Sequence, residues 1–283
     1  MGLFGKKGPQ QEPPRAEKPV LKDDDGWRAC VQYGDKMFDA GDIPYAVDFW
    51  TEAVDRFDGS DKAFGKMCAN IADRVVDCCR RESGNGVVCP VHLVARIETE
   101  IEVKLPEIAS EGSLTQRVFD GLVSKMASCG TAERAVILFT SACFCQIGYI
   151  GSVCDLREVP VRCGDVLRGA DAADEAIDSV GKGGRGMDPR SAHRSVMLYR
   201  EYFSDLRDCT ETVLSGRGQD EIDRAVSYWT DHRRERTKYL SDALGEKSRY
   251  ASSPTKFGKK GHGRSCYALL ADFAEEYFSE PSA

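Results

Sequence analysis

The residues with the most distinctive chemistry are a small group of cysteines with a histidine. Cys78 and Cys79 are adjacent, and a Cys-x-x-His spacing follows at Cys89 and His92. Thiolates and imidazole are the ligands that zinc prefers, and a Cys-x-x-His pair can chelate a metal from a single turn. Adjacent cysteines on a helix point apart, however, and the paired Cys-x-x-Cys of a zinc knuckle is absent from this region. We therefore expect no metal, and the alternative is a zinc site built from these four residues.

The remaining cysteines predict packing rather than catalysis. The chain holds twelve cysteines and four histidines. Cys30, Cys68 and Cys143 fall on apolar stripes, where free cysteine is typically a small core residue. None has the histidine and acid partners that activate a nucleophile, so we expect a non-enzymatic protein without a cofactor. Because the first 25 residues contain no apolar run, we expect no secretory signal, and the twelve cysteines then predict a reducing, cytoplasmic location.

Charge is distributed unevenly along the chain. The net charge is −7, which argues against a basic coat for nucleic acid over the whole molecule. Residues 232–264 nevertheless hold ten basic and three acidic side chains, a net charge of +7. Aromatic residues lie between these basic side chains, and such a segment could follow a phosphate backbone. A solvated loop is the simpler interpretation, and the alternative function is nucleic-acid association through Arg233, Arg234, Arg236, Lys238, Lys256, Lys259 and Lys260.

The elements that position these residues are predicted to be helices. From Gly26 onward, apolar residues return every three or four positions, as on one face of an α-helix. One stripe covers residues 27–38 and the next 45–57; Gly41-Asp42 separates them, and Pro44 suits the first turn of the second helix. So short a turn requires an antiparallel pair. Further helical patterns cover residues 61–81, 91–106, 114–128, 132–148, 165–180, 191–214, 219–244 and 265–278.

These patterns predict an all-α fold of stacked antiparallel helix hairpins, either an α-solenoid or an irregular helical bundle. Residues 135–154 carry no charge and are long enough to span a membrane. Polar residues and glycines interrupt this run, so we expect a buried central helix and no membrane span. The predicted organisation is a disordered tail at 1–25, a helical repeat region at 26–180, a glycine-rich linker at 181–190, a helical region at 191–246, a basic loop or linker at 247–264 and a C-terminal helix at 265–283.

A short pattern occurs three times at nearly equal spacing. Ala46-Val47-Asp48-Phe49-Trp50-Thr51 is similar to the segments that begin at Ala135 and Ala225, which lie 89 and 90 residues further along in turn. A small residue lets a neighbouring helix approach closely, and an aromatic residue four positions later fills the next gap on the same face. Equal spacing favours an internal repeat. Convergence of packed helices on the same pattern is the alternative.

Residues 27–57 resemble a tetratricopeptide repeat. Gly34, Gly41-Asp42, Ala46, Trp50 and Ala53 match the places where this family has small, turn and aromatic residues, whereas Cys30, Met37 and Asp58 depart from its pattern. The resemblance implies a stacked-helix array that binds a protein or peptide through its concave face. It also implies that outward positions of the first helix make the contacts, which here would be Arg28, Asp35 and Asp39. The predicted function is therefore a protein-interaction scaffold or adaptor.

Overall fold

The computed structural model describes residues 19–81, 91–109, 114–150, 156–180, 187–215 and 218–228. Within these ranges every regular element is a helix, which confirms the predicted all-α class. The helices are α1 (Trp27–Asp39), α2 (Ile43–Asp55), α3 (Asp61–Arg81), α4 (Val91–Lys104), α5 (Pro106–Ala109), α6 (Leu114–Met126), α7 (Ala132–Ile150), α8 (Val159–Val180) and α9 (Pro189–Leu214), and a further helical segment covers 219–228.

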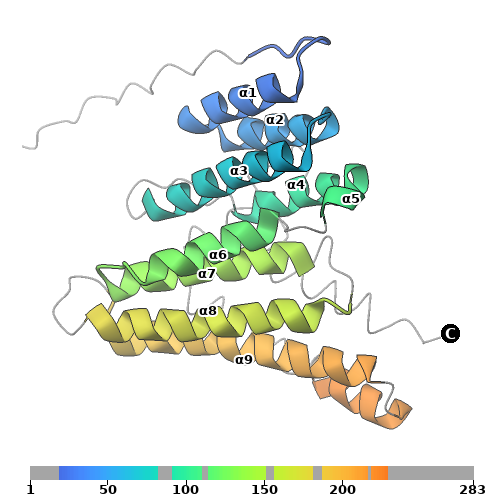
Figure 1. The fold of residues 1–283 in the computed structure, drawn as a ribbon. Helices are drawn as coiled ribbons and strands as arrows, with labels where there is room; N and C mark the ends of the chain where they lie inside the picture. The colour runs from blue at the N-terminus through green and yellow to red at the C-terminus, as the bar shows by residue number, and fades with distance from the viewer. Residues whose placement is uncertain are drawn as a thin grey trace, which may run out of the picture.

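The helices form an elongated stack of two layers (Figure 1). Consecutive helices pack closely in the pairs α1–α2, α6–α7 and α8–α9. In one layer α3 packs on α6 and α6 on α8; in the other α2 packs on α4, α4 on α7 and α7 on α9. Each pair therefore contacts mainly its neighbours along the stack, as the prediction of stacked hairpins requires.

The first hairpin has the turn and the packing that its sequence predicts. Gly41 adopts φ +79°, and its N–H donates to the carbonyl of Phe38 while the next N–H donates to Met37, both at 2.9 Å. These two bonds close α1 in a Schellman motif, which favours glycine at this position. Trp50 of α2 is fully buried against α1. Its indole ring lies so close to Gly34 that a Cβ at that position would be 2.5 Å from two of the ring atoms.

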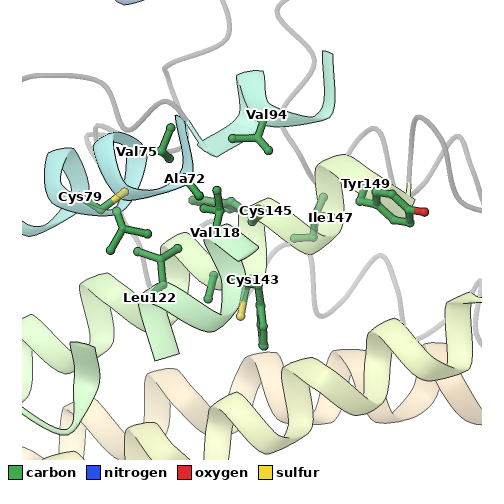
Figure 2. Packing of buried hydrophobic residues seen from close by; sticks show 14 of the residues in the cluster. Ala72, Val75, Cys79, Val94, Val118, Leu122, Cys143, Cys145, Ile147 and Tyr149 are labelled. Carbon is green, nitrogen blue, oxygen red and sulfur yellow. The ribbon is translucent and has the colours of Figure 1, made fainter. Parts of the chain in front are cut away.

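Residues 135–150 of the uncharged segment belong to α7, the central helix of the stack, whereas 151–154 lie outside the described residues. From Leu138 to Ile150 every residue of α7 is buried, since α3, α4, α6, α8 and α9 all pack around it. Figure 2 shows Cys143, Cys145 and Ile147 of α7 among apolar side chains of the neighbouring helices. No helix in the described part of the chain combines the length and the apolar character that a membrane crossing needs.

The described part of the chain begins at residue 19, seven residues before the first predicted helical residue, Gly26. Residues 19–25 belong to the predicted tail, yet they lie against the first hairpin. Nη1 of Arg56 donates to the carbonyl oxygens of Lys22 at 3.0 Å and Asp25 at 2.8 Å, which fixes this segment to the end of α2. The rest of the predicted tail, residues 1–18, lies outside the described residues.

The predicted linker at 181–190 overlaps the start of α9. Asp188 caps this helix by accepting from the N–H groups of Arg190 and Ser191, and Pro189 occupies its first turn. α8 begins at Val159, six residues before its predicted start, and α9 packs along α8.

Residues 181–186 lie outside the described part, as do 229–283, which include the predicted basic loop and C-terminal helix.

Candidate functional site

Two of the three predicted contact residues, Asp35 and Asp39, belong to a polar network that joins α1 to α3. Asp35 accepts hydrogen bonds from the indole Nε1 of Trp50 and the amide of Asn70, both at 3.3 Å. Arg74 places its Nε 3.0 Å from Asp35 and its Nη1 2.9 Å from Asp39. One guanidinium of α3 therefore connects two carboxylates that are one turn apart on α1.

The three predicted residues have different environments. Arg28 is exposed, and its guanidinium lies over the ring of Trp27, 4.5 Å from the ring centre. The side chain of Asp39 is 68% exposed, whereas that of Asp35 is only 22% exposed. Arg28 and Asp39 are therefore accessible to a partner, while Asp35 acts mainly inside the protein.

Sequence reasoning missed Asn70 and Arg74. These residues are four apart on α3, as Asp35 and Asp39 are on α1, so each pair lies on one helix face. That matched spacing of acidic and donor residues is the signal that could have identified the network. It could not by itself show which two helices meet.

Two further ion pairs cross from α2 to α4 in the other layer. Asp48 lies 2.7 Å from Arg96, and Asp55 lies 2.9 Å from Lys104. The hydrogen bond to Asp55 raises the pKa of Lys104. All four side chains are about half exposed. Ion pairs this exposed contribute little to the free energy of unfolding.

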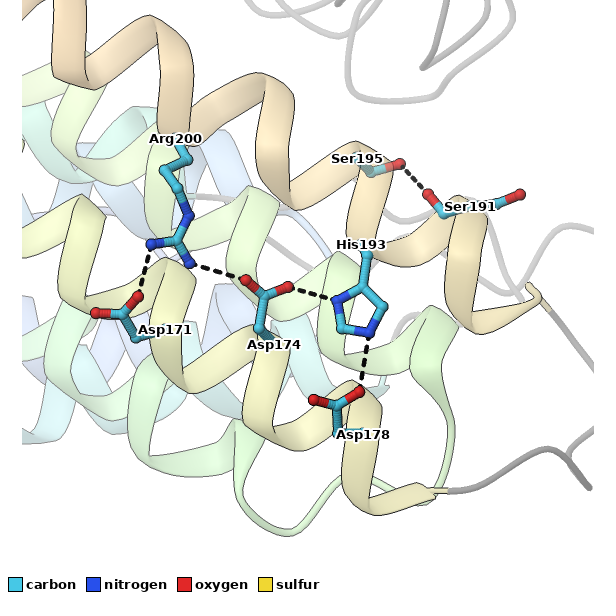
Figure 3. A network of polar contacts seen from close by, with 7 residues as sticks. All are labelled: Asp171, Asp174, Asp178, Ser191, His193, Ser195 and Arg200. Atoms are coloured by element: carbon cyan, nitrogen blue, oxygen red, sulfur yellow. Dashed lines mark hydrogen bonds and ion pairs between the residues drawn. The ribbon is translucent and has the colours of Figure 1, made fainter.

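A larger network lies along the contact between α8 and α9 (Figure 3). Arg200 donates to Asp171 at 2.6 Å and to Asp174 at 2.8 Å. His193 lies between Asp174, 2.7 Å from its Nδ1, and Asp178, 3.1 Å from its Nε2. The three carboxylates are on one face of α8, and the two basic residues are seven positions apart on α9, so the network follows the antiparallel pair.

Charged side chains also occupy helix ends inside the stack. The carboxylate of Glu98, fully buried on α4, accepts from the backbone N–H of Thr115 at 2.7 Å and from its hydroxyl at 3.0 Å, in the first turn of α6. Arg134 of α7 donates to the carbonyl of Cys79 at 2.6 Å, near the end of α3. Each charge is favourable at its helix end, because helix N-termini attract anions and C-termini attract cations.

Burial dominates the electrostatics of Glu98. One carboxylate oxygen accepts both bonds from Thr115, and the other has no hydrogen-bond partner among the described residues. Burial raises the pKa of Glu98, and the hydrogen bonds from Thr115 oppose that change. Loss of solvation therefore outweighs the favourable position at the start of α6.

The cysteines of the described part are packing residues. Burial raises the pKa of Cys68 and Cys209 to about 12, so these thiols stay protonated and are poor nucleophiles. Of the predicted zinc ligands, Cys79 is buried in the core, whereas Cys89 and the side chains of Cys78 and His92 lie outside the described residues. In the described ranges, no group of three histidine, cysteine or acidic side chains is arranged to hold a metal.

The seven basic residues of the alternative nucleic-acid site lie in 229–283, outside the described residues. Comparisons with protein-family models, with curated proteins and with solved structures find no match to the chain. The resemblance of residues 27–57 to a tetratricopeptide repeat therefore stays a prediction.

Proposed function

We propose that the protein is a non-enzymatic interaction module, a scaffold or adaptor of the tetratricopeptide type that binds a protein or peptide in the cytoplasm. The observation that supports this most directly is the polar surface shared by α1 and α3. Arg74 of α3 holds Asp35 and Asp39 of α1, so the surface exists only when α3 lies against the first hairpin.

Such a surface suits recognition of an extended or helical partner. Stacked helices bury their apolar faces against each other and leave a broad face free for binding. On α1 that face offers the cation of Arg28 and the carboxylate of Asp39 about three turns apart, both accessible. Asp35 has a different role in the proposal, because it orients Arg74 and the indole of Trp50.

The experiment is a pull-down from native lysate with quantitative mass spectrometry. The test variant carries Arg28→Ala and Asp39→Ala. The control variant carries Arg194→Ala and Glu201→Ala, which remove the same charges from exposed positions on α9. We expect the test variant to lose a defined set of partners that wild type and control retain at similar levels. Equal recovery by all three proteins would refute the proposal for this surface.

The alternative function gives a different result in the same experiment. If the basic segment binds nucleic acid, RNA or DNA will be recovered, and binding will weaken steeply with salt because Lys and Arg displace condensed counterions. Replacing Lys256, Lys259 and Lys260 by Gln would then abolish recovery, while the variants on α1 would not. That outcome would favour nucleic-acid association over protein binding.

A further inference from the structure

The contact between α8 and α9 contains a histidine held from both sides by carboxylates. We propose that His193 is a protonation switch: its imidazolium ties the start of α9 to the last turns of α8, and loss of the proton releases that end of the hairpin. The inference does not depend on the proposed partner surface, which lies at the opposite end of the stack on α1 and α3 (Figures 1 and 3).

The number of protons on the imidazole ring decides whether both contacts of His193 can form. Nδ1 of His193 lies 2.7 Å from Asp174 and Nε2 lies 3.1 Å from Asp178. Ionised carboxylates only accept hydrogen bonds, so both contacts are satisfied only when both ring nitrogens carry a proton. A neutral imidazole has one N–H, and its other nitrogen would then point a lone pair at a carboxylate oxygen. One of the two contacts must therefore weaken on deprotonation.

The two carboxylates differ in how firmly they are held. Asp174 is 31% exposed and also accepts from Arg200 at 2.8 Å, so it is fixed whatever the state of the histidine. Asp178 is 76% exposed, and its contact with His193 is the longer one. The contact with Asp178, in the last turn of α8, is consequently the one that breaks.

Acidic groups dominate the surroundings of His193. α8 presents Asp174 and Asp178 to the ring, and Asp171 reaches it only through Arg200. On its own helix the nearest charges in sequence are the exposed Arg190 and Arg194. α7, which also packs on α9, has only two charged residues, Glu133 and Arg134, both in its first turn.

The direction of the pKa change agrees with this geometry. The hydrogen bond to Asp174 raises the pKa of His193 above its ordinary value of 6.5, and the bond to Asp178 acts in the same sense against partial burial. A group whose pKa is raised by folding stabilises the folded state, and this stabilisation is fully present when the pH lies below the group's unfolded pKa. That stabilisation is lost as the pH rises through the folded pKa, so the contact opens at a pH above the ordinary histidine value of 6.5.

Release is confined to one end of the hairpin. Further along α9, Tyr199 is buried and its ring packs edge-on against Phe139 of α7, with 5.7 Å between the ring centres. Near His193, the buried apolar residues are smaller, such as Ala192 and Ile177. Opening would therefore expose a limited apolar surface at the start of α9, while the rest of the helix stays packed.

Hydrogen exchange with mass spectrometry on the full chain tests the switch. Amides in 174–180 and 189–196 are followed at about pH 5.5 and about pH 8.5, on either side of the ordinary histidine pKa, after correction for intrinsic exchange. We expect wild type to exchange about two- to fivefold faster at the higher pH, the range that corresponds to a part-exposed ion pair. The His193→Gln variant should show no such change. Residues 27–55 contain no histidine and provide the internal control.

Two results would overturn the proposal. One is a wild-type response that is absent, or that persists in the glutamine variant. The other is an NMR titration of the wild-type imidazole that gives a pKa at or below 6.5, which requires no variant. If His193→Gln fails to fold, Asp178→Asn replaces it: the amide can pair with a neutral ring, so the pH response should shrink and the imidazole pKa should fall.

Discussion

Gly34 gives the sharpest test of how the first hairpin is packed, because two effects of known sign oppose each other there. Replacing a glycine inside a helix by alanine stabilises by about 1 kcal/mol through helix propensity. At Gly34, however, the new Cβ would lie 2.5 Å from Cδ1 and Nε1 of Trp50 and 3.1 Å from the carbonyl oxygen of Ala46. The indole is fully buried and also packs on Phe38, so it has little room to move.

Overpacking of this kind costs about 1–3 kcal/mol, and contact with both a ring and a backbone atom places Gly34→Ala toward the upper end. After the gain in propensity, we expect a net loss of roughly 2 kcal/mol in the free energy of unfolding. Gly65→Ala is the matched control, since a Cβ at Gly65 in α3 would meet only the end of Arg117 at 4.0 Å. That variant should gain up to about 1 kcal/mol.

Urea unfolding followed by circular dichroism measures both variants, with the difference between them expected at about 3 kcal/mol. The double variant Gly34→Ala with Trp50→Phe adds a second check, because the smaller ring should recover part of the loss and give a favourable coupling energy. If Gly34→Ala stabilises as much as Gly65→Ala does, the close approach of Trp50 to α1 is wrong.

Three further predictions concern buried and polar groups. Trp50→Ala should lower the free energy of unfolding by about 3–5 kcal/mol, the range for a buried aromatic residue, in the same urea assay. Asp35→Ala should cost about 1–3 kcal/mol, because it leaves the indole N–H without its acceptor, whereas Asp39→Ala should change stability by less than about 0.5 kcal/mol; equal effects would contradict the different roles of these carboxylates. The pKa of Glu98 is raised in the folded state. The protonated carboxyl group therefore stabilises the folded protein at a pH below the unfolded pKa, and this stabilisation is lost as the pH rises through the folded pKa. Unfolding measured at about pH 4 and about pH 7 should therefore show Glu98→Gln gaining stability relative to wild type at the higher pH, and a constant difference would count against the raised pKa.

Helical periodicity predicted most of the fold because it reports on a property of single helices. Spacing predicted the buried face of α1, and Gly41 and Pro44 predicted where α1 ends and α2 begins. On α2 the prediction is only partly right, because Tyr45, the first residue of the predicted stripe, is exposed. The segment around Arg56 was missed for the opposite reason. Residues 19–25 have no periodic apolar pattern, and they are held by backbone carbonyls, which every residue possesses.

The polar networks depend on which helices meet and in which register, and a pattern within one helix does not contain that information. Asp35 has the spacing of an outward residue on α1, and this suggested a contact with a partner. α3 brings Arg74 and Asn70 to it, and the same carboxylate becomes an internal acceptor. The prediction of exposure is therefore most secure for Arg28 and Asp39, which the stack leaves accessible.

The similar segments that begin at Ala46, Ala135 and Ala225 show the same division between local pattern and stack. In α2 and α7 the alanine and the aromatic residue four positions later are all buried, as the pattern predicts. Their contacts differ, since Trp50 lies against a glycine of its own hairpin, whereas Phe139 approaches a glycine of the following one, Gly169. Ala225 is only partly buried in the helical segment 219–228. The pattern thus selects the face that can be buried, while the neighbouring helix decides whether it is buried and what it contacts.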